Sequence, residues 1–153
     1  MTPVCTIMIG RIDDWLKKVV KRDNIAIDPE CLEWAGVAVF KHAYEIFEER
    51  GYQTRLLTAA YRNHYAWSAL MGGRISMTLT RYYLEQVELS GFEIKESMSA
   101  PVSPELVAQL KDKLPDFVRA YEEDGMKEEE FEHYGAFITC RKAFLKDMTT
   151  CCR

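Results

Sequence analysis

Three short apolar runs, each separated from the next by a stretch long enough for a helix, constrain the fold of this chain most. The runs are residues 4–9 (VCTIMI), 53–60 (QTRLLTAA) and 75–80 (ISMTLT). The first run is apolar throughout and partly β-branched, which is typical of a strand buried on both faces of a parallel sheet. Parallel neighbours need crossovers of about a dozen residues or more, usually helical. The pattern therefore predicts an α/β fold with about three parallel βα units.

The stretches between and after these runs contain helix signals. Residues 12–21 have apolar side chains at helical spacing. Asp28 and Pro29 are typical of a helix start, because an Asp caps free N–H groups and a Pro suits the first helical position. We expect this second helix to end at Gly51. Two further helices are predicted, over residues 62–71 and 81–89.

The strand pattern stops near residues 97–101 (SMSAP), where the composition changes. Beyond this point Pro104 and Pro115 are expected to begin helices. Residues 128–146 predict one amphipathic helix. The sequence therefore predicts two parts, an α/β part over residues 1–97 and a C-terminal helical extension over residues 98–153.

Composition and charge exclude several classes of function. A chain of 153 residues with 48% hydrophobic residues can bury one core. Its net charge of -4 argues against nucleic acid as a partner, because phosphate backbones need a cationic surface. No stretch of eighteen apolar residues or signal peptide is found, so no membrane segment is predicted. The five cysteines are odd in number and lack a CxxC pair, which favours the cytoplasm and offers no metal site.

Three arginines follow the ends of the predicted strands. Ligands of parallel α/β proteins bind beyond the carboxyl ends of the strands, and Arg11, Arg62 and Arg81 each lie within two residues of such an end. A guanidinium group matches a phosphate bidentately, so Arg11 and Arg62 on neighbouring strands would clamp one anion. The alternative is that these arginines are surface residues or ion-pair partners of Asp13, Asp14 or Glu85. The same strand ends contain no lysine, no Gly-rich phosphate loop and no nucleophile–base pair, so no catalytic residue is predicted.

Two segments at these strand ends resemble the transaldolase family. They are residues 5–15 (CTIMIGRIDDW) and 51–63 (GYQTRLLTAAYRN), and the run over residues 75–80 follows in the family's order. The resemblance implies a TIM barrel of the class I aldolase type. It also implies a transferase of carbohydrate metabolism that moves a dihydroxyacetone unit between sugar phosphates through a lysine imine, as in the pentose phosphate pathway. That scheme uses no metal and no organic cofactor.

The resemblance also implies roles for individual residues. Arg11 and Arg62 would hold the substrate phosphate, and Thr6 would face the sugar where the family usually has a serine. Ala60 stands where the family often has a serine that assists phosphate binding. The sugar phosphate is therefore the expected ligand.

The matched strands correspond to the sixth, seventh and eighth of the family's barrel, which takes about 250 residues when complete. We therefore expect the chain to be the C-terminal part of a transaldolase-like protein, a partial barrel without the Schiff-base lysine. A partial barrel leaves an open strand edge, which predicts self-association or pairing with the missing half-barrel. One alternative is a non-catalytic interaction module that docks a partner through this edge. Another is a standalone enzyme of unknown reaction on a small α/β fold.

Overall fold

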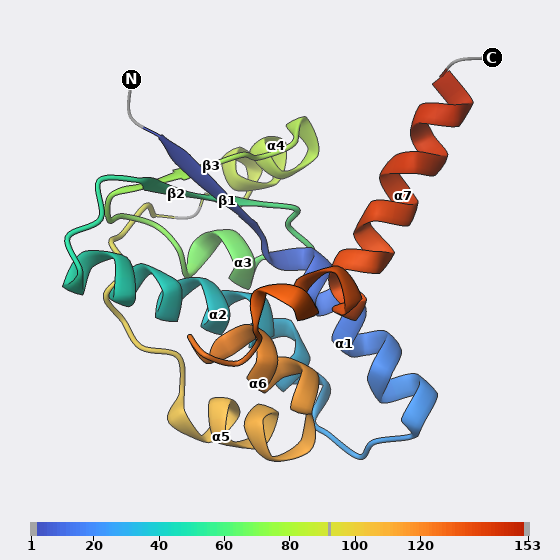
Figure 1. Cartoon of the computed structure of the whole chain (residues 1–153). Coiled ribbons are helices and arrows are strands. Elements are labelled where there is room, and N and C mark those ends of the chain that lie inside the picture. The colour runs from blue at the N-terminus through green and yellow to red at the C-terminus, as the bar shows by residue number, and fades with distance from the viewer. Residues whose placement is uncertain (1–2, 92, 152–153) are drawn as a thin grey trace.

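Three parallel strands form one sheet, and helices connect them (Figure 1). The strands β1 (Val4–Met8), β2 (Arg55–Ala59) and β3 (Ile75–Met77) lie side by side in chain order. Both pairs are parallel. The computed structural model describes residues 3–91 and 93–151 of the 153. The prediction of an α/β fold with three parallel strands is confirmed.

Helices fill the connections between the strands. The first crossover contains α1 (Ile9–Asp23) and α2 (Pro29–Glu49), and the second contains the short α3 (Tyr65–Ser68). The helix α4 (Arg81–Leu89) follows β3. Asp28 caps α2 as predicted, since its side chain accepts a hydrogen bond of 3.0 Å from the backbone N–H of Glu30. Among the described residues no helix is both long and apolar enough to cross a membrane.

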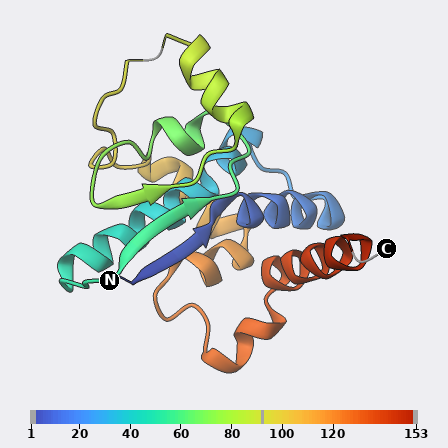
Figure 2. The same cartoon turned by 90° about the horizontal axis from the view of Figure 1, so that it is seen from above.

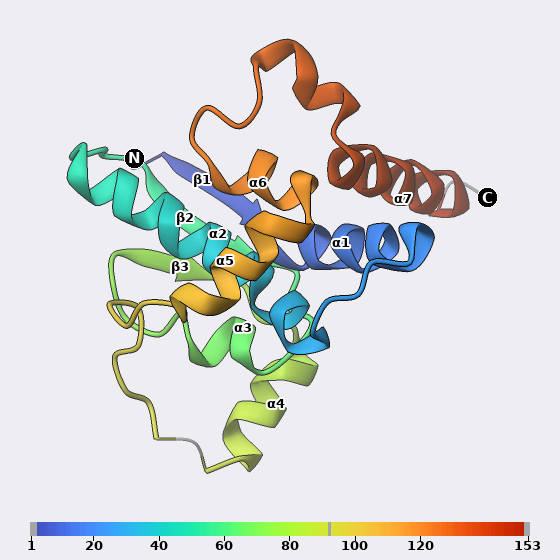
Figure 3. The ribbon, with the colours of Figure 1, turned by 90° about the horizontal axis from the view of Figure 1, so that it is seen from below.

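The C-terminal helices α5 (Pro104–Lys113) and α6 (Pro115–Tyr121) pack across α1 and α2, as Figure 3 shows from below. The four helices share a cluster of buried apolar side chains, which includes Ile12, Leu16, Leu32, Ala35, Leu110, Leu114 and Phe117. Each large side chain buried there stabilises the fold by about 1.5–3 kcal/mol. Residues on both sides of position 97 therefore contribute to one core, and the boundary between two parts at this position stays a prediction.

A second cluster lies between α2, the sheet and α3. Its buried members include Ile9, Val37, Phe40, Leu56, Trp67 and Leu70. In a parallel register, residues that face each other lie on the same side of the sheet, so Ile7 and Thr58 point to this helix-covered side together with Leu56. The opposite face of the sheet holds Thr6 and Leu57.

The prediction that the first strand is buried on both faces is wrong. Val4 is 51% exposed, and Cys5 and Thr6 are exposed too. Val4 and Thr6 alternate with Ile7 and so point to the face of the sheet opposite the helices, and among the described residues β1 has a paired neighbour on one side only. The apolar run thus has more apolar surface than the described residues cover.

The prediction of one helix over residues 128–146 is also wrong. A 3-10 helix, η1 (Glu128–His133), is followed by a separate helix α7 (Gly135–Cys151). The break lies at Tyr134, whose backbone is extended and whose hydroxyl donates to the carbonyl oxygen of Asp116 at 3.0 Å. Trp15 packs so closely against Gly135 that a Cβ there would overlap its ring. These tertiary contacts set the start of α7, which lies alongside α1 (Figure 2).

Candidate functional site

The carboxyl ends of β1 and β2 are brought together by a close contact between two backbones. Gly10 lies in the first turn of α1, where a Cβ would overlap the carbonyl oxygen of Ala60 and come within 2.8 Å of Cγ of Arg62. Ala60 adopts a left-handed conformation with φ of 65°, which is uncommon for a residue with a side chain. The start of α1 and the exit of β2 are therefore held against each other, and the two candidate arginines leave from this junction.

Arg62 is held by a carboxylate and by two carbonyl groups. Its Nε donates to both carboxylate oxygens of Asp14 at 3.0 and 3.1 Å, and its Nη2 donates to one of them at 2.7 Å. Its Nη1 donates to the carbonyl oxygens of Ala60 and Tyr61 at 3.2 and 3.1 Å. Hydrogen bonding to Asp14 raises the pKa of the guanidinium. One N–H of Nη2 is left for a further acceptor, because a guanidinium has five N–H groups.

The ion-pair alternative weighed in the sequence thus applies to two of the three arginines. Arg62 pairs with Asp14, and both side chains are about one third exposed. Arg81 pairs with Glu85 one helical turn away at 2.7 Å, and the Arg81 side chain is 92% exposed. Arg81 therefore lies on the surface of α4.

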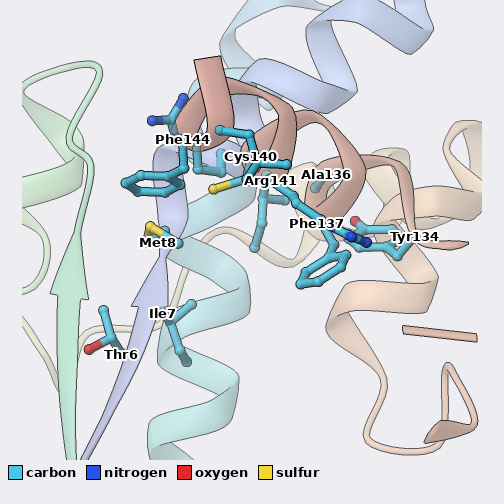
Figure 4. A pocket seen from close by; sticks show the side chains of 12 residues that line it. Thr6, Ile7, Met8, Tyr134, Ala136, Phe137, Cys140, Arg141 and Phe144 are labelled. Atoms are coloured by element: carbon cyan, nitrogen blue, oxygen red, sulfur yellow. The ribbon is translucent and has the colours of Figure 1, made fainter. Parts of the chain in front are cut away.

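A cavity of about 520 Å³ lies between β1 and α7 (Figure 4). Arg11 of α1 is one of the residues that line it. Thr6 lines the same cavity from β1. The Arg11 guanidinium lies 5.8 Å from the centre of the Phe144 ring, within the range of a cation–π contact. Its Nε is buried and has no hydrogen-bond partner among the residues that the structure describes. The structure thus places two of the three predicted substrate-binding residues, Thr6 and Arg11, in one cavity.

Arg62 lines a different, smaller hollow of about 200 Å³ at the exit of β2. The other residues lining it are mostly aromatic or polar: Asn63, His64, Trp67, Tyr82, Tyr83 and Gln86. The two guanidinium groups lie at the same end of the sheet without sharing a cavity in the described part of the chain. A joint anion site of Arg11 and Arg62 therefore stays a prediction.

Asp13, which the sequence offers only as an acid at a helix start or an ion-pair partner of an arginine, is buried, and no arginine pairs with it among the described residues. It is 1% exposed, and its Oδ1 accepts a hydrogen bond of 2.8 Å from the backbone N–H of Gly36 in the middle of α2. Burial raises the pKa of Asp13 from 3.8 to about 7. A Cβ at position 36 would lie 2.9 Å from the same carboxyl oxygen, so the glycine makes room for the acid. The glycine inside a predicted helix was the signal in the sequence for such a close contact.

Lys41 is the one buried lysine among the residues whose burial the structure describes. It is 6% exposed on α2, and its Nζ donates to the carbonyl oxygen of Ser97 at 2.8 Å and to that of Ala100. Burial lowers the pKa of Lys41. These bonds fasten the chain over residues 97–100 to α2. The described residues contain no cluster of three or more His, Cys, Asp or Glu side chains that could hold a metal ion.

Comparison with known proteins shows similarity to one family model and to curated proteins. The family model described as Transaldolase/Fructose-6-phosphate aldolase matches residues 4–135, a range that includes Thr6, Arg11 and Arg62. A curated transaldolase from Cellvibrio japonicus (strain Ueda107) is 26% identical over 121 residues, which are 79% of this chain and 36% of that protein. The chain thus spans little more than a third of the length of this relative. No solved structure matches the chain.

Proposed function

Because the chain belongs to the transaldolase/fructose-6-phosphate aldolase family, we propose that it is the sugar-phosphate-binding portion of a transaldolase-like enzyme. Members of this family fold as (β/α)₈ barrels, and the open sheet of three parallel strands is part of such a barrel. In the proposal Arg11 and Arg62 bind the phosphate group and Thr6 contacts the sugar. The lysine that forms the imine belongs to a part of the barrel outside this chain.

The observation that supports this proposal best is the contact of Gly10 with Ala60. It brings the ends of two neighbouring strands together, and each end presents an arginine at the side of the sheet where parallel α/β proteins bind ligands. The Arg11 guanidinium faces an aromatic ring, and no carboxylate pairs with it in the described residues. An oxyanion would supply the missing acceptors.

The ion pair of Arg62 with Asp14 is compatible with phosphate binding. A partly exposed ion pair contributes about 0–1 kcal/mol, whereas each hydrogen bond to a charged group contributes about 1.5–3 kcal/mol. A phosphate with three acceptor oxygens can therefore share the guanidinium with Asp14 or displace that carboxylate.

The transfer of a dihydroxyacetone unit belongs to the assembled enzyme in this proposal. None of the three strands contains a lysine. The buried Lys41 has the lowered pKa that imine formation needs, but its ammonium group is bound to two carbonyl oxygens. We assign the enzyme to cytoplasmic carbohydrate metabolism of the pentose phosphate type, which agrees with free thiols at Cys5, Cys31 and Cys140.

Calorimetric titration with inorganic phosphate and with fructose 6-phosphate tests the assignment of the arginines. Arg11→Ala and Arg62→Ala should each weaken binding about tenfold to a hundredfold, the equivalent of one hydrogen bond to a charged group. The matched control is Arg81→Ala, because Arg81 follows the third strand and points to solvent. Equal affinities of the wild type and all three variants would remove Arg11 and Arg62 from the site.

Borohydride reduction in the presence of a ketose phosphate tests whether the lysine lies outside the chain. We expect no covalent adduct on this chain alone. Mass spectrometry of the digested protein would locate any adduct, and Lys41→Arg serves as the control for the buried amine. A trapped lysine would overturn the claim that this portion binds substrate without forming the imine.

The proposal also concerns what covers the open edge of the sheet at β1. Among the described residues β1 has a paired neighbour on one side only, and in the proposal a second copy of the chain or the missing half-barrel covers its outer side. An association that is insensitive to sugar phosphate and to both arginines would instead favour a non-catalytic docking module.

A further inference from the structure

Asp13 is a buried acid beside one of the two arginines of the candidate anion site. The carboxyl accepts its hydrogen bond from the N–H of Gly36 inside the protein, where the residue is 1% exposed. The backbone of α2 at Gly36 lies so close that even a Cβ there would come within 2.9 Å of this oxygen. The next residue in the chain is Asp14, whose carboxylate binds the guanidinium of Arg62. Packing therefore keeps the Asp13 carboxyl next to the group that is proposed to bind phosphate.

The cations near Asp13 pair with other carboxylates. Lys17, one turn further along α1, pairs with Glu33 of α2, and Arg62 pairs with Asp14. In the described part of the chain no salt bridge joins Asp13 to a cation. Burial is the largest cause of the raised pKa of Asp13, about 7 instead of 3.8, and the charges of Glu33 and Asp14 also raise it. Asp13 can therefore gain or lose a proton near neutral pH.

The charge of Asp13 acts on the guanidinium of Arg62. Hydrogen bonding to Asp14 is the main cause of the raised pKa of Arg62, and the negative charges of Asp14 and Asp13 raise it too. A negative charge that stabilises this cation also repels an anion bound to it. Salt screens such an interaction less between buried or partly buried groups than between exposed ones. Ionised Asp13 should therefore weaken the binding of an anion at Arg62, whereas protonated Asp13 should not.

We infer that Asp13 takes up a proton when the anion site is filled, so that the affinity of the chain for phosphate falls as the pH rises through neutrality. The inference rests on the proposed function, because it assumes that Arg62 binds the phosphate group. By linkage, a bound anion favours the protonated acid by the same factor by which the protonated acid favours the anion. Asp13 thus regulates the site through its charge and needs no contact with the ligand.

Calorimetric titration of the full chain with inorganic sulfate between pH 5.5 and pH 8.5 tests this inference. Sulfate is a divalent oxyanion like phosphate, but its own charge is constant over this range. At constant ionic strength the affinity of the wild type should fall about five- to tenfold as the pH rises. The affinity of Asp13→Asn should stay near the low-pH value of the wild type. Asp14→Asn is the matched control, since it removes the adjacent, partly exposed carboxylate and should keep the fall with pH.

His64 is a further titratable side chain of this region. It lines the hollow that contains Arg62, and its charge acts on Glu33. His64 is exposed, so water and salt screen its charge more than that of the buried Asp13. His64→Gln should consequently keep most of the pH dependence. A dependence that is lost in His64→Gln and kept in Asp13→Asn would overturn the inference.

The carbon-13 signal of the Asp13 carboxyl gives a second readout, which a purely structural role of this residue would not change. In protein labelled at the aspartate Cγ atoms, saturating sulfate should raise the pKa of Asp13 by the logarithm of the same affinity ratio. Asp13→Asn identifies the signal by its loss. An unchanged pKa of Asp13 in saturating sulfate would contradict the coupling.

The remaining outcomes separate this inference from the proposed function. A sulfate affinity of the wild type that does not depend on pH would overturn the inference and leave the anion site in place. No sulfate binding at any pH would overturn both. Circular dichroism at each pH reports whether the chain stays folded. A fall in affinity that coincides with loss of the helical signal would place the effect in unfolding and would also overturn the inference.

Discussion

Replacing Asp13 by Asn should make the protein more stable at neutral and alkaline pH. The carboxyl is 1% exposed, and burial raises its pKa from 3.8 to about 7. At 1.36 kcal/mol per pKa unit, this shift corresponds to about 4 kcal/mol between the two protonation states. Because the pKa is raised in the folded state, the contribution of Asp13 to stability is fully present below about pH 4. It is lost as the pH rises through about 7.

Asn keeps the acceptor for the N–H of Gly36 and removes the ionisation. The two proteins should therefore have similar free energies of unfolding near pH 4, and Asp13→Asn should be more stable by about 4 kcal/mol at pH 8. Urea denaturation at one-unit intervals between pH 4 and pH 8 measures this difference in the free energy of unfolding. The other acidic residues are the same in both proteins, so their contributions cancel in the difference. Asp14→Asn is the matched control, since it removes a partly exposed ion pair worth at most about 1 kcal/mol. A difference between wild type and Asp13→Asn that is constant over this range would refute the reasoning.

Three further substitutions test the junction between the two strand ends. Gly10→Ala forces a Cβ into the carbonyl oxygen of Ala60 and should lower the free energy of unfolding by about 3 kcal/mol in urea denaturation. A change no larger than the experimental error would show that the two backbones can move apart without loss of stability. Ala60→Gly relieves about 1–2 kcal/mol of left-handed strain against about 0.4–1 kcal/mol of added chain entropy in the unfolded state. We therefore expect a gain of roughly 0.5 kcal/mol in the same assay, and a net loss would be inconsistent with strain at this position. Asp14→Asn frees one edge of the Arg62 guanidinium and removes a repelling charge, so calorimetry should show phosphate binding several-fold tighter. Weaker binding would mean that Asp14 orients Arg62 rather than competing with the anion.

Helix starts and strands that depend on neighbouring residues in the sequence lie where the sequence predicts them. Asp28 caps α2 as its position before Pro29 predicts, and the three strands follow the three apolar runs. The burial of β1 does not follow from its own residues. The burial of an apolar strand depends on the elements that pack against it. Among the described residues β1 has a neighbouring strand on one side only.

Contacts between distant residues could not be predicted from spacing. Asp116 accepts hydrogen bonds from Trp15, which lies 101 residues earlier in the sequence, and from Tyr134. These contacts fix where α7 begins. Asp13 has the sequence context of an exposed helix residue, and only the packing of Gly36 against α1 shows that it is buried. In the candidate site the positions of Arg11 and Arg62 at strand ends could be predicted, whereas the partner of Arg62 depends on which carboxylate α1 presents to it.

The central claim is that Arg11 and Arg62 bind one phosphate group together. Two-dimensional nuclear magnetic resonance of the arginine Nε–H groups in the nitrogen-15-labelled protein tests it directly, with fructose 6-phosphate as the titrant. The account predicts that the signals of Arg11 and Arg62 shift with one common dissociation constant while the signal of Arg81 stays in place. A response of one arginine alone, or two different dissociation constants, would contradict a shared anion site.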